Sequence, residues 1–229
     1  MHAEHLAIQA VVFDLDDTLY PERDYVRSGY RAVARHLRRR LGCRHPVDQW
    51  LWERFCLGHR AKAFDAMNAA FSLGLSGDQI AELVGVYRRH APQIRPYPAA
   101  EGLLERLGRR YRLGLLSDGY LPAQRLKLAA LGIEGLFDAV VFSEDLGRDA
   151  WKPSPAGFEA IRRELDVPNE RCAYVADNPA KDFLAPNGLG WLTIRFVCDG
   201  QVHAGSAAPP GGEPQIVIRS LDDLETAVT

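Results

Sequence analysis

The sequence predicts an α/β protein: a parallel sheet with helices on both faces, interrupted after its first strand by an all-helical domain. Two observations support this prediction. Short apolar runs alternate with helical patterns along the chain, which is typical of parallel strands buried on both faces. Between the first apolar run and the second lies a long stretch with helical periodicity and no strand-like run. The 229 residues, 47% of them apolar, suffice for one large core with a sizeable insertion.

Apolar runs rich in β-branched residues are expected to form the strands of this Rossmann-like sheet. They span residues 10–14, 113–117, 139–143, 172–177, 191–197 and 215–219. Helical patterns between them span residues 99–111, 122–132 and 154–165. A short helix capped by Ser220 is expected to close the chain.

The helical stretch after the first run is predicted to be a separate domain. Its helical patterns span residues 24–41, 47–58, 60–74 and 76–90. Proline-bearing connectors, "YPERD" and "APQIRPYPA", flank it and favour a separate domain over helices packed directly on the sheet. The predicted domains are a discontinuous core, residues 1–19 and 96–229, and a helical cap domain, residues 20–95.

Composition and charge disfavour several classes of partner. The net charge of −2 gives no overall attraction to nucleic acid or to an anionic membrane. No apolar run approaches the length of a membrane span, and the first ten residues lack the features of a signal peptide. The 4 cysteines show no C-x-x-C spacing and no secretory framework. We therefore expect a cytoplasmic protein, a monomer or a homodimer, that acts on a small molecule.

The first apolar run ends in a concentration of negative charge. In "VVFDLDDTLY" the strand-like residues lead into Asp14, Asp16 and Asp17. Carboxylates this close repel one another, and burying them unpaired costs several kcal/mol or raises their pKa. A metal ion, a lysine or the start of a helix is therefore expected to compensate the charge.

Polar residues also follow three other predicted strands. They are Ser117, Asp118 and Gly119 after the second strand, Lys152 after the third, and Asp177 and Asn178 after the fourth. The carboxyl ends of parallel strands form the ligand-binding edge of an open α/β sheet. Magnesium prefers one or two carboxylates together with phosphate oxygens and water, so Asp14 and Asp177 are suited to hold it. Ser117 offers a donor to phosphate, and Lys152 offers a positive charge.

Each of these residues also has a structural interpretation. Ser154 and Asn178 precede prolines and fit helix caps, while Ser117 is equally suited to a turn. Taken singly, Lys152 is more typical of a surface lysine. Asp14 is harder to explain in this way, since a carboxylate rarely ends a fully apolar strand. The convergence of four strands on one edge favours a functional site over these separate explanations.

Four motifs carry a resemblance to a known family. They are "DLDDT" at residues 14–18, "LLSDG" at 115–119, "WKPSP" at 151–155 and "DNPAKD" at 177–182. In this order the motifs resemble those of the haloacid dehalogenase-like (HAD) hydrolase superfamily, in particular its phosphatase branch with a helical cap inserted after the first motif. The resemblance spans nearly the whole chain. One departure is "VADN", which replaces the glycine that frequently precedes the last acidic motif.

The resemblance implies a role for each motif residue. Asp14 would be the nucleophile that forms an aspartyl-phosphate, Asp16 would protonate the leaving oxygen and then activate water, and Lys152 would neutralise charge. The phosphate-binding residues would be Thr18, Ser117, Asp118 and Gly119. The cofactor would be Mg²⁺, held by Asp14, Asp16 (through its carbonyl) and Asp177, with Asp182 and Asn178 in the surrounding layer.

The predicted function is magnesium-dependent hydrolysis of a small phosphorylated metabolite, a sugar phosphate or a nucleoside monophosphate. Dehalogenation is disfavoured, because a halide leaves without protonation and the dehalogenases lack an acid at the position of Asp16. One alternative is a phosphomutase on the same scaffold. The mutases of the family usually carry Gly-Val where this chain has Asp17 and Thr18, which weighs against it. The other alternative is a catalytically idle HAD-like binding protein.

Overall fold

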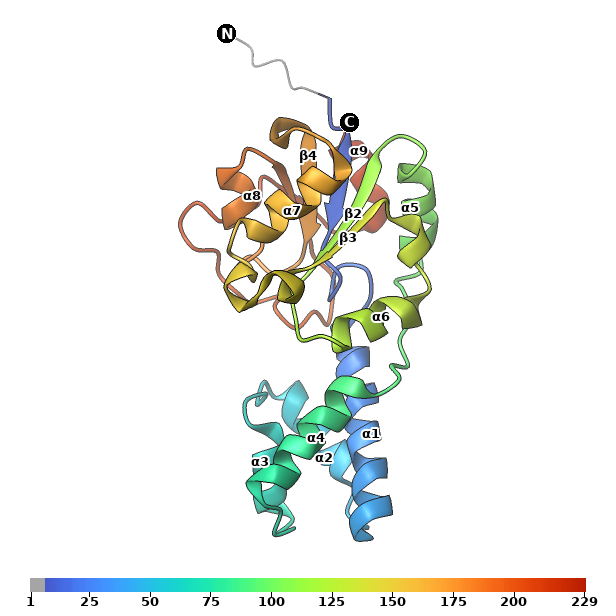
Figure 1. Ribbon diagram of the computed structural model, residues 1–229, viewed down its shortest axis with the longest axis vertical. Coiled ribbons are helices and arrows are strands. Elements are labelled where there is room, and N and C mark those ends of the chain that lie inside the picture. The colour runs from blue at the N-terminus through green and yellow to red at the C-terminus, as the bar shows by residue number, and fades with distance from the viewer. Residues whose placement is uncertain (1–6) are drawn as a thin grey trace. The chain divides into compact units, whose positions relative to one another are not determined.

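The computed structural model describes residues 7–229, which divide into two compact units (Figure 1). One unit combines the chain up to Arg23 with Arg95–Thr229, and the other comprises Asp24–Ile94. The sequence predicted boundaries after residues 19 and 95. In the structure the first boundary lies a few residues later, after Arg23, and the second lies after Ile94. Residues 1–6 of the predicted core segment lie outside the described part of the chain.

The first unit contains a six-stranded sheet in the order β3-β2-β1-β4-β5-β6, and every pair of neighbouring strands is parallel. The strands are β1 (Ala10–Phe13), β2 (Arg112–Ser117), β3 (Ala139–Phe142), β4 (Cys172–Ala176), β5 (Leu192–Phe196) and β6 (Ile216–Ile218). Each strand coincides with a predicted run to within one or two residues at either end. The predicted fold class is thereby confirmed.

The helices of this unit also follow the predicted pattern, with shorter spans. They are α5 (Ala100–Leu107), α6 (Ala123–Leu131), α7 (Ala156–Leu165) and α9 (Leu224–Ala227), together with a short helix that was not predicted, α8 (Leu184–Gly188). The 3₁₀ helices are η1 (Glu134–Leu136), η2 (Ser143–Leu146), η3 (Arg148–Ala150), η4 (Asn169–Arg171) and η5 (Leu221–Asp223). Ser220 caps η5 rather than an α-helix, and Pro155 occupies the N-cap position of α7, one residue after Ser154.

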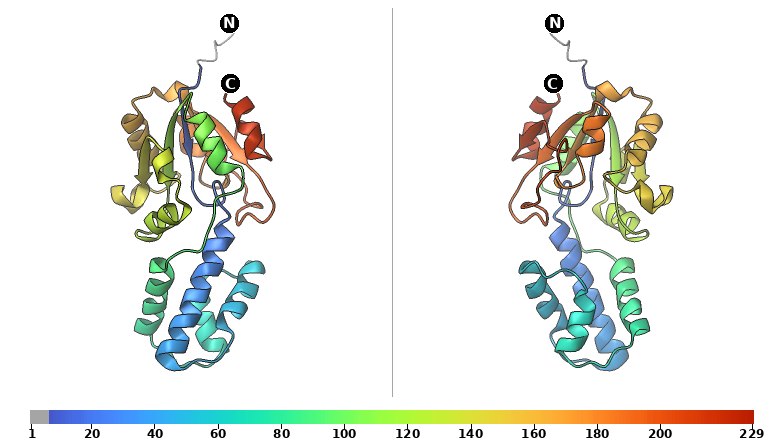
Figure 2. Two further views of the ribbon diagram at one scale, coloured as in Figure 1. Left: turned by 90° about the vertical axis from the view of Figure 1, so that its right-hand side faces the viewer. Right: turned by 90° about the vertical axis from the view of Figure 1, so that its left-hand side faces the viewer.

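Helices cover both faces of the sheet, with α7 on one face and α5 and α9 on the other (Figure 2). Alternate residues of a strand point to opposite faces. Val12 and Leu116 lie in one buried cluster with Phe158 and Ile161 of α7. Gly114 of β2 permits this close packing, because a Cβ there would lie 2.8 Å from Cδ1 of Ile161.

The strand order places β1 at the centre of the sheet. Ala10 pairs with Arg112 of β2 on one side and with Cys172 of β4 on the other. The chain proceeds outward from β1 through β2 to β3, then crosses back to form β4, β5 and β6. Open α/β sheets bind ligands beyond the carboxyl ends of the strands at such a reversal. Asp14, the residue after β1, lies at this position.

The second unit is helical, as the sequence predicts. Its helices are α1, which begins at the end of the first unit (Glu22–Leu41), α2 (Val47–Cys56), α3 (Ala63–Ala70) and α4 (Gly77–Arg89). Aromatic rings form part of its core: the ring centroid of Tyr87 lies 5.8 Å from that of Tyr30 and 5.9 Å from that of Phe64. Ser76 begins α4 with a capping box that includes Gln79. Within residues 7–229, no helix combines the length and apolar character needed to cross a membrane.

Candidate active site

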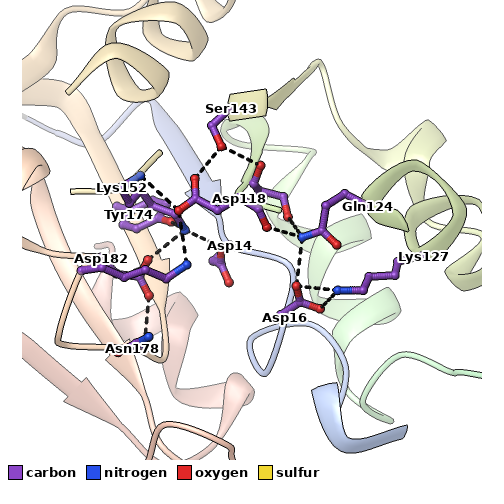
Figure 3. A network of polar contacts seen from close by, with 12 residues as sticks. Asp14, Asp16, Asp118, Gln124, Lys127, Ser143, Lys152, Tyr174, Asn178 and Asp182 are labelled. Atoms are coloured by element: carbon purple, nitrogen blue, oxygen red, sulfur yellow. Dashed lines mark hydrogen bonds and ion pairs between the residues drawn. The ribbon is translucent and has the colours of Figure 1, made fainter. Parts of the chain in front are cut away.

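Two groups of polar side chains, joined through Asp118, lie at the loop after β1 (Figure 3). The first, which we call the Lys152 cluster, comprises Lys152, Asp14, Asp182 and Tyr174. The second, which we call the Lys127 cluster, comprises Lys127, Asp16, Gln124 and Tyr20. Lys152 provides Asp14 with a positive charge, and Lys127 does the same for Asp16. The repulsion expected between these two carboxylates is therefore offset by lysines from two different parts of the chain.

The Lys152 cluster is buried. The Nζ atom of Lys152 lies 2.5 Å from Oδ1 of Asp14 and 2.8 Å from Oδ1 of Asp182, and it also contacts the Tyr174 hydroxyl at 2.8 Å. Burial alone would lower the pKa of Lys152, but the two carboxylates raise it well above its usual value. The lysine is therefore charged, and it offsets the negative charge of the carboxylate at the end of β1.

Asp177 and Thr18 carry buried oxygens that lack partners. Within residues 7–229, neither Oδ2 of Asp177 nor Oγ1 of Thr18 has a hydrogen-bond partner. Burial, followed by the charges of Asp182 and Asp14, raises the pKa of Asp177 to about 10. An unsatisfied buried oxygen typically costs about 1–3 kcal/mol. Both atoms are therefore suited to a ligand at this edge of the sheet.

The carboxylates of Asp14 and Asp177 fit a hard divalent cation. Burial raises the pKa of Asp14 to about 6 even though Lys152 opposes the shift, and a second positive charge would reverse the effect. In the described chain no group of three or more His, Cys, Asp or Glu side chains is arranged to hold a metal ion. Magnesium needs fewer protein ligands, because water and substrate phosphate complete its coordination. Asp14 and Asp177, with a backbone carbonyl such as that of Asp16, match that requirement.

The loop after β4 is held by Asn178 and Asp182. The backbone N–H of Asn178 donates to Oδ2 of Asp182 at 3.0 Å, and Oδ1 of Asn178 accepts from the N–H of Ala180 at 3.1 Å. Asn178 therefore caps a turn, and not the α-helix that its position before a proline suggested. The other oxygen of Asp182 contacts Lys152, which places both residues in the layer behind the ion pair.

The loop after β2 brings Ser117, Asp118 and Gly119 to the same edge. The carboxylate of Asp118 accepts hydrogen bonds from Oγ of Ser143 at 2.6 Å and from the backbone N–H of Lys152 at 3.1 Å. Burial raises the pKa of Asp118, but Lys152 and Lys181 outweigh it, and the pKa lies below its usual value. An ionised carboxylate repels phosphate, so Asp118 can fill its predicted phosphate-binding role only through its backbone N–H.

The Lys127 cluster holds Asp16 from helix α6. The Nζ atom of Lys127 lies 2.7 and 2.8 Å from the two carboxylate oxygens, and Nε2 of Gln124 donates to Oδ2 at 3.0 Å. The hydroxyl of Tyr20 donates to Oδ1. Burial alone would raise the pKa of Asp16. Lys127 and these hydrogen bonds lower it by more than burial raises it, so the pKa lies below its usual value. Lys127 and these hydrogen bonds therefore favour the ionised form of Asp16, the form that a base requires.

Sequence reasoning did not identify Gln124 and Lys127. Both are buried, with 1% and 5% of their surfaces exposed, and both lie on the helix predicted at residues 122–132. Their spacing of three residues puts them on the same side of the helix as the buried Leu128 and Leu131. Two long polar side chains among apolar neighbours were the signal for a buried polar partner.

Asp17 has a structural task that the motif did not reveal. Its backbone is left-handed, with φ of 53°. Its carboxylate accepts from the N–H of Glu22, the first residue of α1, at 2.8 Å, and from the N–H of Val202 at 2.5 Å. Gln201 donates to the Asp17 carbonyl at 2.8 Å. The loop at residues 199–214, expected to be exposed, is thus anchored beside the site at one end.

Comparison with known proteins extends these observations. A model of the haloacid dehalogenase-like hydrolase family matches residues 8–190. Glyceraldehyde 3-phosphate phosphatase of Methanopyrus kandleri is 29% identical over 199 residues, which cover 82% of this chain and 84% of that protein. Phosphoserine phosphatase of Thermus thermophilus is 34% identical over 110 residues, covering 48% of this chain and 43% of that protein.

The fold is likewise similar to that of solved structures. The magnesium-bound HAD-hydrolase YfnB from Bacillus subtilis matches with a TM-score of 0.71 and 20% identity, covering 98% of this chain and 100% of that chain. This likeness concerns the fold, while the sequence matches concern the activity. The family model and the sequence matches show that the chain belongs to the haloacid dehalogenase-like hydrolase family and is a phosphoric monoester hydrolase.

Proposed function

We propose that the chain is a magnesium-dependent phosphatase of a small sugar phosphate, and that it acts through an aspartyl-phosphate on Asp14. The contact of Asp14 with Lys152, beside the unpartnered oxygen of Asp177, is the observation that supports this most directly. Glyceraldehyde 3-phosphate is the first substrate to test, because the Methanopyrus kandleri relative is named for it. Nucleoside monophosphates form the second class.

In the first step, a carboxylate oxygen of Asp14 attacks phosphorus and the bond from phosphorus to the ester oxygen breaks. Asp16, which must carry a proton at this point, donates it to the departing oxygen, so the alcohol leaves as a neutral molecule. Lys152 keeps its positive charge beside Asp14 and stabilises the negative charge that the phosphoryl group carries. Ser117, Thr18 and the backbone N–H groups near Gly119 position the phosphate oxygens.

In the second step, Asp16 takes a proton from a water molecule whose oxygen attacks the same phosphorus. The bond between phosphorus and Asp14 breaks, inorganic phosphate is released, and the Asp14 carboxylate is restored. Asp16 thus serves as acid and then as base, each use restoring the protonation state that the other needs. Bound between Asp14, the Asp16 carbonyl and Asp177, magnesium would supply positive charge to the phosphate oxygens.

The test of this function is phosphate release from a panel of esters by the purified chain. We expect turnover of at least one small sugar phosphate with magnesium, loss of turnover in EDTA, and its recovery when magnesium is added in excess. Calcium should restore little activity, because its coordination is larger and looser. Full turnover in EDTA would refute the metal requirement. Conversion of a sugar phosphate to its isomer without free phosphate would indicate a mutase instead.

The helical unit Asp24–Ile94 is proposed to act as a cap that selects the substrate. Proline-bearing connectors on both sides of the unit are suited to a hinge. A chain in which a short bridge replaces residues 24–91 should still cleave a small aryl phosphate if its core folds. Its specificity constants should differ less among the sugar phosphates of the panel. Unchanged discrimination would show that the helical unit does not select the substrate.

A further inference from the structure

The Lys127 cluster adds to the site two residues that lie outside the family motifs. Lys127 contacts both oxygens of the Asp16 carboxylate, and Gln124 donates to one of them (Figure 3). Nε2 of Gln124 also contacts Oγ of Ser117 at 2.9 Å and the carbonyl oxygen of Asp118. Gln124 therefore links the proposed acid–base residue to the loop that is proposed to bind phosphate.

Lys127 and Gln124 are both buried, which is unusual for these residue types. Lys127 and Gln124 are 5% and 1% exposed, whereas most lysines and glutamines lie at the surface. A buried ammonium group needs a charged partner, and within the cluster Asp16 takes that place. Two carboxylate oxygens, each contacted by donors from a rigid helix, leave the Asp16 side chain few orientations.

The backbone opposite Gln124 is fitted to this side chain. Gly119 has a φ of +139°, and a Cβ at this position would lie 2.9 Å from Cδ and from Nε2 of Gln124. Any larger residue would therefore push Gln124 away from Asp16 and Ser117. The glycine of the second motif makes room for the amide, in addition to its proposed role in binding phosphate.

We propose that Lys127 and Gln124 are positioning residues that hold the Asp16 carboxylate in the orientation required for proton transfer to the leaving oxygen. The proposal rests on the proposed function, in which Asp16 is the acid and base. It assigns no substrate contact to Lys127, which acts only through Asp16. Its chemical consequence is selective: protonation matters for an alkoxide leaving group and matters little for nitrophenolate, a good leaving group.

The experiment compares kcat/KM for two esters, because this ratio reports the step in which the ester bond breaks. The first is 4-nitrophenyl phosphate, and the second is the alkyl phosphate that the wild-type chain hydrolyses fastest. Lys127→Met should lower kcat/KM for the alkyl ester by about 10–100-fold and for the aryl ester by less than about 3-fold, within the range of general acid catalysis. Gln124→Leu should also lower kcat/KM for both esters. Its effect on the alkyl ester should be smaller than that of Lys127→Met.

A double-mutant cycle then tests whether Lys127 acts through Asp16. In the Asp16→Asn background, adding Lys127→Met should change kcat/KM for the alkyl ester by less than about 2-fold, because the group that Lys127 positions is already lost. Lys127→Arg keeps the charge and the donors, and should recover part of the activity lost in Lys127→Met. Arg125→Met, an exposed cation on the same helix, is the matched control and should resemble wild type.

The outcomes separate this proposal from the proposed function. If the wild-type chain hydrolyses neither ester, the proposed function itself fails. If it hydrolyses both esters, two results refute the positioning role. One is an equal fall in kcat/KM for the alkyl and aryl esters in Lys127→Met. The other is a loss on adding Lys127→Met to Asp16→Asn that is as large as the loss in the wild-type background. Circular dichroism and thermal unfolding of each variant identify a folding defect. Should Lys127→Met not fold, Gln124→Leu and Lys127→Arg carry the same comparison, and an equal loss on both esters again refutes the role.

Discussion

The two lysines of the site serve neighbouring carboxylates in different ways. Lys152 comes from the loop after η3, its side chain is 1% exposed, and it contacts both Asp14 and Asp182. Lys127 comes from helix α6 and contacts Asp16, whose side chain is 20% exposed. Lys152 thus lies between two buried carboxylates, Asp14 and Asp182, whereas Lys127 holds the Asp16 carboxylate, which water can reach.

This difference follows the chemistry proposed for each aspartate. A nucleophile must stay deprotonated and fixed in line with phosphorus, so a permanent charge within a closed, rigid cluster suits Asp14. An acid–base residue must exchange protons with substrate and water, so partial exposure suits Asp16. The comparison shows that two aspartates only two residues apart obtain separate environments, because Asp14 faces the loop that carries Lys152 whereas Asp16 faces helix α6.

The largest expected effect tests the Asp14 side of the comparison. Asp14→Asn removes the attacking oxygen and a proposed magnesium ligand, so turnover of aryl and alkyl phosphates should both fall by on the order of 10⁴-fold or more. No phosphoryl adduct should form with either ester. Phosphate release and intact-mass spectrometry measure the two results, and an adduct in this variant would show that another residue is the nucleophile.

Asp16→Asn tests the other side and should have a smaller effect that depends on the leaving group. Turnover of alkyl phosphates should fall by about 10²–10⁴-fold, because neither the leaving oxygen nor the attacking water exchanges a proton. With 4-nitrophenyl phosphate the first step should survive while hydrolysis stalls. Peptide mapping after mixing should then locate a phosphoryl group on Asp14. An adduct on Ser117, or normal turnover of alkyl esters, would contradict the assigned roles.

Removing each lysine compares the two clusters through stability. Lys152→Met leaves two buried carboxylates without their partner and should lower the free energy of unfolding by about 3–5 kcal/mol. Lys127→Met leaves one carboxylate that water reaches and that Gln124 and Tyr20 still contact, so a loss of about 1–3 kcal/mol is expected. Urea denaturation in EDTA measures both values. Equal losses in the free energy of unfolding would show that the exposure of Asp16 to water does not reduce the cost of removing its lysine.

The same contrast explains what could be predicted from the sequence. Strands, their parallel pairing and the inserted helices followed from apolar runs and periodicity, which local sequence encodes directly. Asp14, Ser117 and Asp177 were found because each ends or directly follows a strand, and parallel strands bring such positions together. Lys152 was found because a short loop after the third strand leads to it, and a motif also marks it. Their proximity in the structure agrees with the prediction, while their catalytic roles stay predictions.

Gln124, Lys127 and the task of Asp17 could not be predicted in this way. The two α6 residues reach the site through the packing of a helix, which no local pattern specifies. The partners of Asp17 include Val202, far along the chain, and a contact of this kind depends on how a loop returns to the sheet. The hydrogen bond from Ser143 to the Asp118 carboxylate was missed for the same reason, because Ser143 begins η2, in another part of the chain.

The central position of β1 has a consequence for how the chain folds. The strand is made early, yet its partners β2 and β4 include Arg112 and Cys172, which are made much later. Contacts between such distant segments are slow to form, because a long loop must close first. During synthesis the apolar segment Ala10–Phe13 therefore waits without its neighbours, while the helices of Asp24–Ile94 can form local contacts at once. The helical unit is in this respect the part of the chain that can fold first, and the edge that carries Asp14 and Asp177 is completed only when β4 is made.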